Sequence, residues 1–349
     1  MSSAAAGPGL PGGLTPVIVG YGRAGSELHH RCLRAVAGGP VDVVAVDPVR
    51  PRRLPPDVRW RPSLAAALST VDPERAVFHV ATPVHTHLAT VEALAAGGAR
   101  RIVLEKPMAH TAADARRVAA VAAGGVQIVP VAVWPASTVT EHVARAIADG
   151  GIGTPRALHM QQSKPRFQRS RRGDAHRCAM EVELPHQLLL ALHLAGPVAA
   201  VTRAAAWNME LPDGDRLPGM GGVAVTLAHT GGITSTLVSD LTSPIRIRRL
   251  RISGTAGRIV AHYPISGEDD VGQLHLPGRP GRTLVRDAPL TRFFDTAYRQ
   301  FAGLPGGPTG DLRMHVRVVE LLETVAARCL AGRSARRDSA RRDEGVHPC

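Results

Sequence analysis

One lysine at the end of an apolar run is a candidate for a chemical role. The sequence has many arginines but only two lysines, Lys106 and Lys164. Lys106 follows the strand-like run 101–104 and precedes Pro107, which ends that run. Lysine is a compact hydrogen-bond donor with an adjustable pKa, which arginine is not. We therefore expect Lys106 to take part in chemistry at a strand end.

A histidine in the second half of the chain has a comparable setting. Pro185 suits the first turn of a helix, so His186 should stand near the start of an apolar helix that ends around Gly196. Such a histidine could act as a general base. Taken alone, His186 is more often explained as a packed core residue, because histidine is intermediate in burial.

A glycine-rich turn near the start of the chain predicts a dinucleotide site. The apolar strand 16–19 leads into Gly20-Tyr21-Gly22-Arg23-Ala24-Gly25 and then into a helix that runs to about residue 37. Gly20 allows the tight turn, Gly22 lets a pyrophosphate approach the backbone, and Gly25 lets the helix pack close to the strand. The helix N-terminus then faces the phosphates.

The end of the second strand bears on the choice of cofactor. Residues 41–46 form a strand that ends at Asp47, 22 residues after Gly25. A carboxylate there accepts hydrogen bonds from the ribose hydroxyls and repels a 2′-phosphate, so NAD is favoured over NADP. Arg50, Arg52 and Arg53 follow closely, and one of them could serve a 2′-phosphate.

Alternating strands and helices predict an α/β protein whose N-terminal domain is a Rossmann fold with a parallel, doubly wound sheet. Ligands bind beyond the carboxyl ends of such strands, where Thr82-Pro83 and Glu105-Lys106-Pro107 lie. From about residue 136 the runs become longer and more β-like, which predicts a second α/β domain with a large, mostly antiparallel open sheet. The expected limits are a flexible start at 1–13, the dinucleotide domain at 14–135, the substrate and oligomerisation domain at 136–332 and a disordered charged tail at 333–349.

These motifs together resemble the Gfo/Idh/MocA family of oxidoreductases, which includes glucose-fructose oxidoreductase and inositol dehydrogenases. The resemblance covers almost the whole chain, and Glu-Lys-Pro after an apolar strand is its most specific part. It rests on the glycine turn, Ala81-Thr82-Pro83 with His87, Glu105-Lys106-Pro107, Gly150-x-Ile152-Gly153, the His186 helix and Ser253-Gly254-Thr255-x-Gly257. It implies hydride exchange between NAD(P) and a sugar or cyclitol carbon, and a homo-oligomer, a dimer or tetramer, formed through the C-terminal sheet.

The resemblance also implies roles for single residues. Lys106 and His186 match the catalytic lysine and histidine, but Val182 stands where the family has an aspartate, and Glu181 and Glu183 flank it. Glu183 lies three residues before His186 and could orient its ring. The implied substrate-binding residues are Lys106, Glu181, Glu183 and His186. The implied cofactor-binding residues are Gly20, Tyr21, Gly22, Arg23, Ala24, Gly25, Asp47, Ala81, Thr82, Pro83, His87, Glu105, Lys106 and Trp134.

Composition excludes several other classes of protein. The formal net charge of +13 comes from scattered arginines, and aromatic residues make up 3% of the chain. Few side chains are therefore available to stack on nucleic-acid bases, and we expect no nucleic-acid partner. The four cysteines lack metal-ligand spacing, and the histidines lack accompanying ligands, so we expect no metal. No apolar run is long enough for a membrane span, and we expect a cytoplasmic protein without a membrane partner.

Three functions fit these observations. The first is an NAD-dependent dehydrogenase that oxidises a ring hydroxyl of a sugar, cyclitol or amino-sugar, including aminoglycoside-type substrates, in a biosynthetic pathway. The carboxylates of Glu181, Glu183, Glu210 and Asp213 suggest a cationic amino-sugar, although they could equally balance nearby arginines. The second is an NAD-binding sensor or scaffold without turnover, suggested by the missing aspartate. The third is a glycosidase that uses NAD transiently.

Overall fold

The computed structural model describes residues 9–172, 176–266, 269–306 and 310–343. The chain divides into two compact units. Unit 1 contains residues 1–137 and 288–319, and unit 2 contains residues 138–287 and 320–349. Each unit is built around its own sheet, and we describe the two in turn.

Unit 1 is organised around a six-stranded sheet in the order β3-β2-β1-β4-β5-β6, and all its strand pairs are parallel. Short apolar strands buried on both faces are typical of such a sheet. Every residue of β2 and β4 is buried. The strands are β1 (Thr15–Val19), β2 (Val43–Val46), β3 (Val58–Arg61), β4 (Ala76–Val80), β5 (Arg101–Leu104) and β6 (Gln127–Pro130). This sheet confirms the predicted Rossmann topology.

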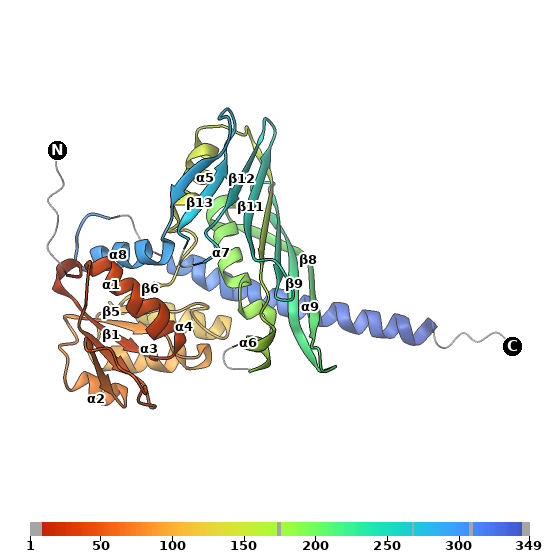
Figure 1. Ribbon diagram of the computed structural model, residues 1–349. Helices are drawn as coiled ribbons and strands as arrows, with labels where there is room; N and C mark the ends of the chain where they lie inside the picture. Colours follow the sequence, from red (N-terminus) through yellow and green to blue (C-terminus); the bar gives the residue numbers. More distant parts are fainter. Residues whose placement is uncertain (1–8, 173–175, 267–268, 307–309, 344–349) are drawn as a thin grey trace. The chain divides into compact units, whose positions relative to one another are not determined.

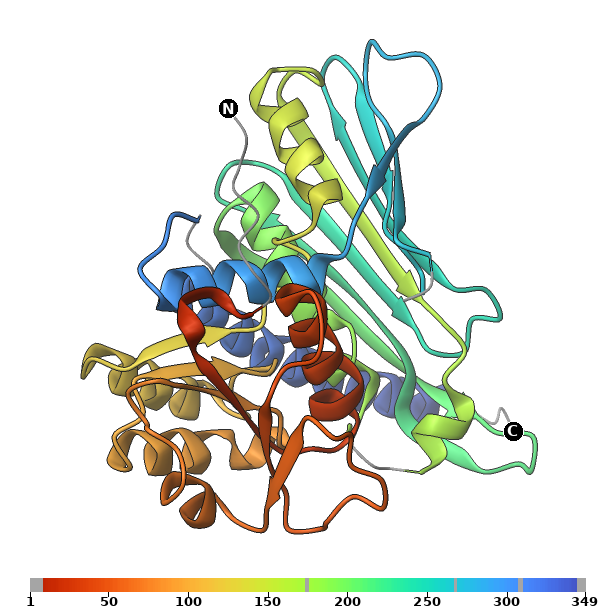
Figure 2. The ribbon, with the colours of Figure 1, turned by 60° about the vertical axis from the view of Figure 1, so that its left-hand side comes forward.

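Helices lie on both faces of this sheet and complete its core. Val17, Phe78, Ile102 and Leu94 are fully buried in one cluster that takes apolar side chains from strands and helices alike. The helical elements are η1 (Pro11–Gly13), the π-helix η2 (Ala24–His30), α1 (Arg31–Ala37), α2 (Leu64–Leu68), η3 (Val84–Thr86), α3 (His87–Ala96), α4 (Ala112–Ala123), α8 (Pro289–Phe301) and the start of α9 (Leu312–Asp343). Helix α8 packs beside α1, although the two are far apart in the sequence (Figure 1 and Figure 2).

Unit 2 is organised around an eight-stranded sheet in the order β14-β13-β12-β11-β7-β10-β9-β8. Its strand pairs are antiparallel except for β7 with β10. The strands are β7 (Pro155–Ser163), β8 (Val198–Glu210), β9 (Arg216–His229), β10 (Thr234–Asp240), β11 (Ile247–Gly254), β12 (Arg258–His262), β13 (Val271–His275) and β14 (Thr283–Arg286). The mostly antiparallel sheet confirms the fold class predicted for the second half.

Burial alternates along the strands of unit 2. In β10, Ser235, Leu237 and Ser239 are buried, while the residues between them are half-buried. This period of two means that one face of the sheet packs inward and the other is more open. The helical elements of this unit are α5 (Thr138–Ala148), α6 (Phe167–Arg171), η4 (Ala179–Glu181), α7 (Leu184–Ala195) and the later part of α9.

Several elements differ from the sequence expectations. Strands β3, β13 and β14 and helix α8 were not expected, and residues 288–319 contribute to unit 1 rather than to the second domain. Helix α9 extends to Asp343, although the sequence predicted a disordered tail from residue 333. Arginine and alanine, which dominate its last turns, are both strong helix formers. Residues 344–349 of that tail, and residues 1–8 of the expected flexible start, lie outside the described residues.

Candidate active site

The glycine turn connects β1 to the π-helix η2 at the carboxyl end of the sheet. Gly20 has a φ of 90°, and a Cβ there would lie 2.8 Å from the Ala81 carbonyl oxygen. A Cβ at Gly25 would lie 2.2 Å from the Gly20 oxygen, so the helix can approach the strand only with glycine. At Gly22 a Cβ would meet no atom within 4 Å. The open side of this turn therefore fits a pyrophosphate, as predicted for a dinucleotide site.

Asp47 follows β2 and braces the glycine turn. One carboxylate oxygen, Oδ2, accepts a hydrogen bond from the Tyr21 backbone N–H at 3.0 Å, and Oδ1 accepts one from Val49. Each oxygen has a second lone pair, so the carboxylate can still accept ribose hydroxyls. The Arg50 guanidinium lies over the Trp60 ring, 5.9 Å from its centroid. This placement directs one of the nearby arginines onto an aromatic ring.

The next strand end carries Ala81, Thr82 and Pro83. The Ala81 N–H donates to the Val19 carbonyl at 2.8 Å, which fixes this turn against the glycine turn. His87 is buried, and its Nε2 forms a hydrogen bond of 2.9 Å with the Thr82 carbonyl. Burial lowers the pKa of His87, so it is neutral at pH 7. The structure thus shows His87 supporting the turn that should face the cofactor.

Glu105 and Lys106 follow β5 at the same edge. The Glu105 N–H donates to the Val80 carbonyl, and the Glu105 carboxylate accepts from the Lys106 N–H at 3.0 Å and from His29 Nε2 at 2.9 Å. Desolvation raises the pKa of Glu105, but the hydrogen bond from His29, the charge of Lys106 and the hydrogen bond from the Lys106 N–H lower it to about 2. Glu105 is therefore an anion across the physiological range.

Trp134 lies in a turn after β6 and is buried, with 5% of its surface exposed. Its carbonyl accepts a hydrogen bond from the Ser137 N–H at 3.1 Å. The contact with the cofactor that the family resemblance implies for Trp134 stays a prediction.

His186 lies in the first turn of α7, in unit 2. Pro185 occupies the first turn as predicted, and the Glu183 carbonyl accepts the His186 N–H at 3.1 Å. His186 is half-buried, whereas the following residues 187–192 are buried. Lys106 belongs to unit 1 and His186 to unit 2, so their joint action remains a proposal.

The residues around the missing aspartate have other partners. Val182 is buried among Ala179, Met209 and Leu241, an apolar cluster that suits valine and would leave an aspartate without solvation. The Glu183 carboxylate forms an ion pair with Lys164, the second lysine of the chain. The expected orientation of the His186 ring, through a hydrogen bond from its N–H to the Glu183 carboxylate, stays a prediction.

The four carboxylates that suggested a cationic substrate are all ion-paired within unit 2. Glu183 pairs with Lys164, and the remaining pairs are Glu181 with Arg177, Glu210 with Arg216 and Asp213 with Arg171. The pairs other than Glu183 with Lys164 have an arginine at least half exposed, so each is worth little in stability. The structure therefore accounts for these carboxylates without an amino-sugar.

Three functional candidates of unit 1 were not expected from the sequence: His29, His79 and Tyr298. Each is fully buried, and they form a hydrogen-bonded chain that ends at Glu105. His79 offered a signal, because it is a single histidine within the apolar strand Ala76–Val80. His29 offered no such signal, and Tyr298 lies in helix α8, which the sequence did not predict.

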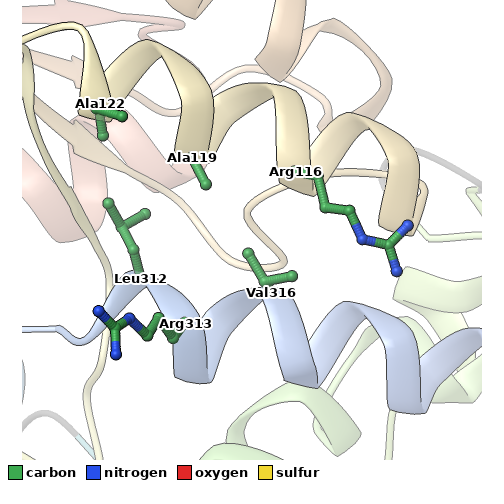
Figure 3. A pocket seen from close by; sticks show the side chains of 7 residues that line it. Arg116, Ala119, Ala122, Leu312, Arg313 and Val316 are labelled. Atoms are coloured by element: carbon green, nitrogen blue, oxygen red, sulfur yellow. The ribbon is translucent and has the colours of Figure 1, made fainter.

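A surface cavity of about 610 Å³ lies elsewhere in unit 1, between α4 and the first turns of α9. Figure 3 shows small and aliphatic side chains between the two helices, with Arg116 and Arg313 at the ends. Its lining consists of Arg116, Ala119, Ala122, Ala123, Leu312, Arg313 and Val316. None of these is a predicted site residue.

Two negative findings hold for the described part of the chain. No group of three or more His, Cys, Asp or Glu side chains is placed to hold a metal ion among the described residues. No helix formed by those residues has the length and apolar character needed to cross a membrane.

Comparison with solved structures shows the same fold over most of the chain. An oxidoreductase from Agrobacterium radiobacter in complex with NAD⁺, L-tartaric acid and magnesium has a TM-score of 0.71 at 18% identity, covering 91% of this chain and 97% of that one. The WlbA dehydrogenase from Bordetella pertussis, with NADH and UDP-GlcNAcA, has a TM-score of 0.72 at 17% identity, with coverage of 91% and 96%. A point mutant of KijD10, a 3-ketoreductase from Actinomadura kijaniata, in complex with TDP-benzene and NADP, has a TM-score of 0.70 at 15% identity, with coverage of 90% and 97%.

Sequence comparison relates one part of the chain to a protein family. No curated protein matches the chain in sequence. Residues 14–133 match the model of the oxidoreductase family with an NAD-binding Rossmann fold, which is the region of the glycine turn, Asp47, Thr82 and Glu105-Lys106. Through this region the chain is similar to the Gfo/Idh/MocA family of NAD-binding oxidoreductases.

Proposed function

We propose that this oxidoreductase transfers hydride between NAD and a ring carbon of a sugar, cyclitol or amino-sugar, oxidising a hydroxyl to a ketone in a biosynthetic pathway. The observation that carries the proposal is the carboxyl edge of the unit 1 sheet. There the open side of Gly22 and the anionic Glu105 beside Lys106 follow strands of one sheet. The solved structure with NADH and UDP-GlcNAcA supports a substrate that contains a sugar.

The residues present suit an NAD molecule. Gly20 to Gly25 would hold the pyrophosphate, Asp47 the adenosine ribose, and Thr82 and Glu105 the nicotinamide half. Bound NAD supplies the acceptor for the hydride that leaves the alcohol carbon. The carboxylate of Asp47 favours NAD over NADP.

In the proposed mechanism Lys106 and His186 act on the same substrate oxygen. His186 accepts the hydroxyl proton on a ring nitrogen, and the Lys106 ammonium donates a hydrogen bond that stabilises developing alkoxide character. Glu183 forms an ion pair with Lys164 and lies three residues before His186 in the sequence. It would therefore contribute to the charge around His186. In the reverse direction His186 returns the proton to the oxygen of the ketone.

A substrate panel tests the activity. Purified protein is incubated with NAD⁺ or NADP⁺ and cyclitols, hexoses, amino-sugars, aminoglycosides or nucleotide sugars, and reduced cofactor is followed spectroscopically. We expect net reduction of NAD⁺ with at least one ring alcohol. Binding of NAD without turnover on any member would indicate a sensor, and hydrolysis of a glycosidic bond without net reduction would indicate a glycosidase.

Variants of the catalytic pair test the mechanism. Lys106→Met and His186→Ala should each lower kcat by about 10²- to 10⁴-fold while leaving NAD affinity within a few-fold of the unmodified protein. His193→Ala, a change in the last turn of the same helix α7, is the matched control and should retain activity. Turnover near that of the unmodified protein in both Lys106→Met and His186→Ala would refute the assignment.

We also infer that the enzyme works in the cytoplasm as a homo-oligomer, a dimer or tetramer, formed through the more open face of the eight-stranded sheet. The half-buried residues that alternate along β10 support this, because such a face gains burial against a second copy. Light scattering on the protein as it elutes from a size-exclusion column measures the oligomeric state. A monomer at micromolar concentration would refute the inference.

A further inference from the structure

A buried hydrogen-bonded chain in unit 1 ends at the carboxylate of Glu105. The Tyr298 hydroxyl lies 2.9 Å from His79 Nε2, His79 Nδ1 lies 3.0 Å from His29 Nδ1, and His29 Nε2 lies 2.9 Å from Glu105 Oε1. The Phe294 ring packs against both imidazoles at steep angles, with centroid distances of 4.9 Å to His29 and 5.2 Å to His79. The chain joins helix α8, strand β4, the π-helix η2 and the end of β5.

The network admits only a few arrangements of protons. Glu105 is ionised and can only accept, so His29 Nε2 carries a proton. Burial holds the pKa of His79 well below its ordinary value, so His79 is neutral and has one proton, on either Nδ1 or Nε2. These two choices give opposite directions to the hydrogen bond between His79 and Tyr298.

The Tyr298 hydroxyl decides between the two directions. If the His79 proton is on Nδ1, it is donated to His29, Nε2 accepts from the Tyr298 O–H, and every donor is satisfied. If it is on Nε2, Tyr298 must accept, and its buried O–H has no other hydrogen-bond acceptor among the described residues. A buried donor without an acceptor is costly. The satisfied arrangement runs from Tyr298 through His79 and His29 to Glu105, with a proton on His79 Nδ1 and a proton on His29 Nε2.

The chain does not conduct a proton to Glu105. Moving one proton along it would leave a buried tyrosinate, and burial raises the pKa of Tyr298 well above its ordinary value of 10. Glu105 has a pKa of about 2. The transfer would therefore create a buried tyrosinate and a protonated Glu105, and both changes are disfavoured. What remains is a fixed set of donors, each of which polarises the next toward the carboxylate.

We propose that Tyr298, His79 and His29 form a positioning chain that holds the Glu105 carboxylate ionised and oriented as an acceptor for a hydroxyl group of bound NAD. One oxygen of this carboxylate is fixed by His29, and the other accepts the Lys106 N–H. The remaining lone pairs of the Glu105 carboxylate can accept hydrogen bonds from a ligand, because Glu105 lies at the carboxyl edge of a parallel sheet, where ligands bind. His79 and Tyr298 act through His29 and Glu105, so they are positioning residues.

The proposal predicts how NAD affinity depends on pH. The titratable groups that bear on Glu105 are Lys106, His87, His29 and, through His29, His79. Glu105 is deprotonated and His79 and His87 are neutral near pH 7. We therefore expect the affinity of the unmodified protein for NAD to be nearly constant between pH 6 and pH 8.

Two substitutions of His79 separate positioning from packing. His79→Leu removes the donor to His29 Nδ1 and should weaken NAD binding about tenfold. His79→Asn keeps an N–H donor near the position of Nδ1, and should restore the affinity to within about threefold. A structural role predicts the opposite order, because leucine suits an apolar strand better than asparagine. Binding is measured by calorimetry, and thermal unfolding is measured on the same samples.

The matched control is His229→Leu. His229 is also a buried histidine with a hydrogen bond to each ring nitrogen, but it lies in unit 2. Its loss should leave the affinity for NAD unchanged. The proposal is overturned if His79→Leu binds NAD like the unmodified protein, or if His79→Asn binds as weakly as His79→Leu.

A measurement on the unmodified protein covers the case in which a variant does not fold. Nitrogen-15 spectra of histidine-labelled protein report which ring nitrogen carries the proton, with His79→Asn and His29→Gln used for assignment. We expect the Nδ1–H form at His79 and the Nε2–H form at His29. A cationic His29 or an Nε2–H form at His79 would overturn the proposal. The inference rests on NAD binding at this edge, so absence of NAD binding in the unmodified protein would instead count against the proposed function.

Discussion

At the scale of the residue, Gly22 and Gly25 of the turn are needed for different physical reasons. Gly25 is needed for packing, since its Cβ would lie 2.2 Å from the Gly20 oxygen and 2.8 Å from the Ile18 side chain. Gly22 is needed for ligand approach, since its own Cβ would meet no protein atom within 4 Å. The same substitution at the two positions should therefore affect different properties.

Gly22→Ala should keep the free energy of unfolding and lower NAD affinity by at least about tenfold, about 1.4 kcal/mol. Gly25→Ala should lower the free energy of unfolding by about 1–3 kcal/mol through overpacking. Denaturant titration and calorimetric NAD titration check the pair. Unchanged NAD affinity in a folded Gly22→Ala protein would contradict the pyrophosphate role of this turn.

The ionisation of Glu105 makes unit 1 sensitive to acid. Its folded pKa of about 2 is below the ordinary 4.5, so the carboxylate stabilises the fold above pH 4.5, and this contribution is lost as the pH falls toward 2. Between pH 7 and pH 3.5 the loss is about 1.4 kcal/mol. Glu105→Gln should lack this part of the pH dependence. Tryptophan fluorescence in a Trp207→Phe background reports the unfolding of unit 1 through Trp60 and Trp134. If the free energy of unfolding depended on pH equally with Glu105 and with Glu105→Gln, the prediction would be contradicted.

At the scale of the element, helix α9 carries a buried histidine in its first turns. His315 is 4% exposed, and its Nε2 has no hydrogen-bond partner among the described residues. Burial lowers the pKa of His315 to about 4, despite the opposing charge of Asp311. The neutral imidazole is compatible with this packing, whereas the cation is not.

His315 should therefore make the start of α9 sensitive to mild acid. Because the folded pKa is depressed, its stabilising contribution is present above the ordinary 6.5 and is lost as the pH falls toward 4. From pH 7 to pH 5 the loss is about 2 kcal/mol. His315→Leu should remove it, whereas replacing the exposed His85 should not. Denaturant titrations at the two pH values measure the difference, and an unchanged loss in His315→Leu would exclude this histidine as the cause.

At the scale of the whole molecule, unit 1 is not continuous in the sequence. Helix α8 returns after unit 2 and provides Phe294 and Tyr298 to the buried chain that ends at Glu105. Arg101 also donates a hydrogen bond to the Phe301 carbonyl. The family match at residues 14–133 therefore covers the nucleotide-binding strands but omits part of their core.

A fragment of residues 1–137 should consequently be incompletely folded. It would expose the apolar surface that α8 covers and leave His79 without its tyrosine. Adding a separate peptide of residues 288–319 should restore cooperative unfolding and NAD binding, whereas a peptide with Phe294→Ser and Tyr298→Ser should not. Circular dichroism and calorimetry check this. Cooperative unfolding and full NAD affinity of residues 1–137 alone would contradict the prediction.

Local patterns in the sequence determined the nucleotide-binding part of this protein. The apolar strands, the spacing of Gly20, Gly22 and Gly25, and Glu105-Lys106-Pro107 are short-range features, and burial on both faces of a parallel sheet leaves a clear apolar signal. The more open sheet of unit 2 was predicted in class, but its last strands were missed because they are short and rich in polar residues.

Only the tertiary structure decided what surrounds the site residues. Tyr298 is 219 residues from His79, and Lys164 is 19 residues from Glu183 on another element, so no local pattern could pair them. The sequence isolated Lys106 as a chemical group, and the structure supplied the neighbouring carboxylate with a buried set of donors. The reason is that hydrogen bonds and ion pairs in a core depend on which distant segments pack together, whereas strands and turns depend mainly on adjacent residues.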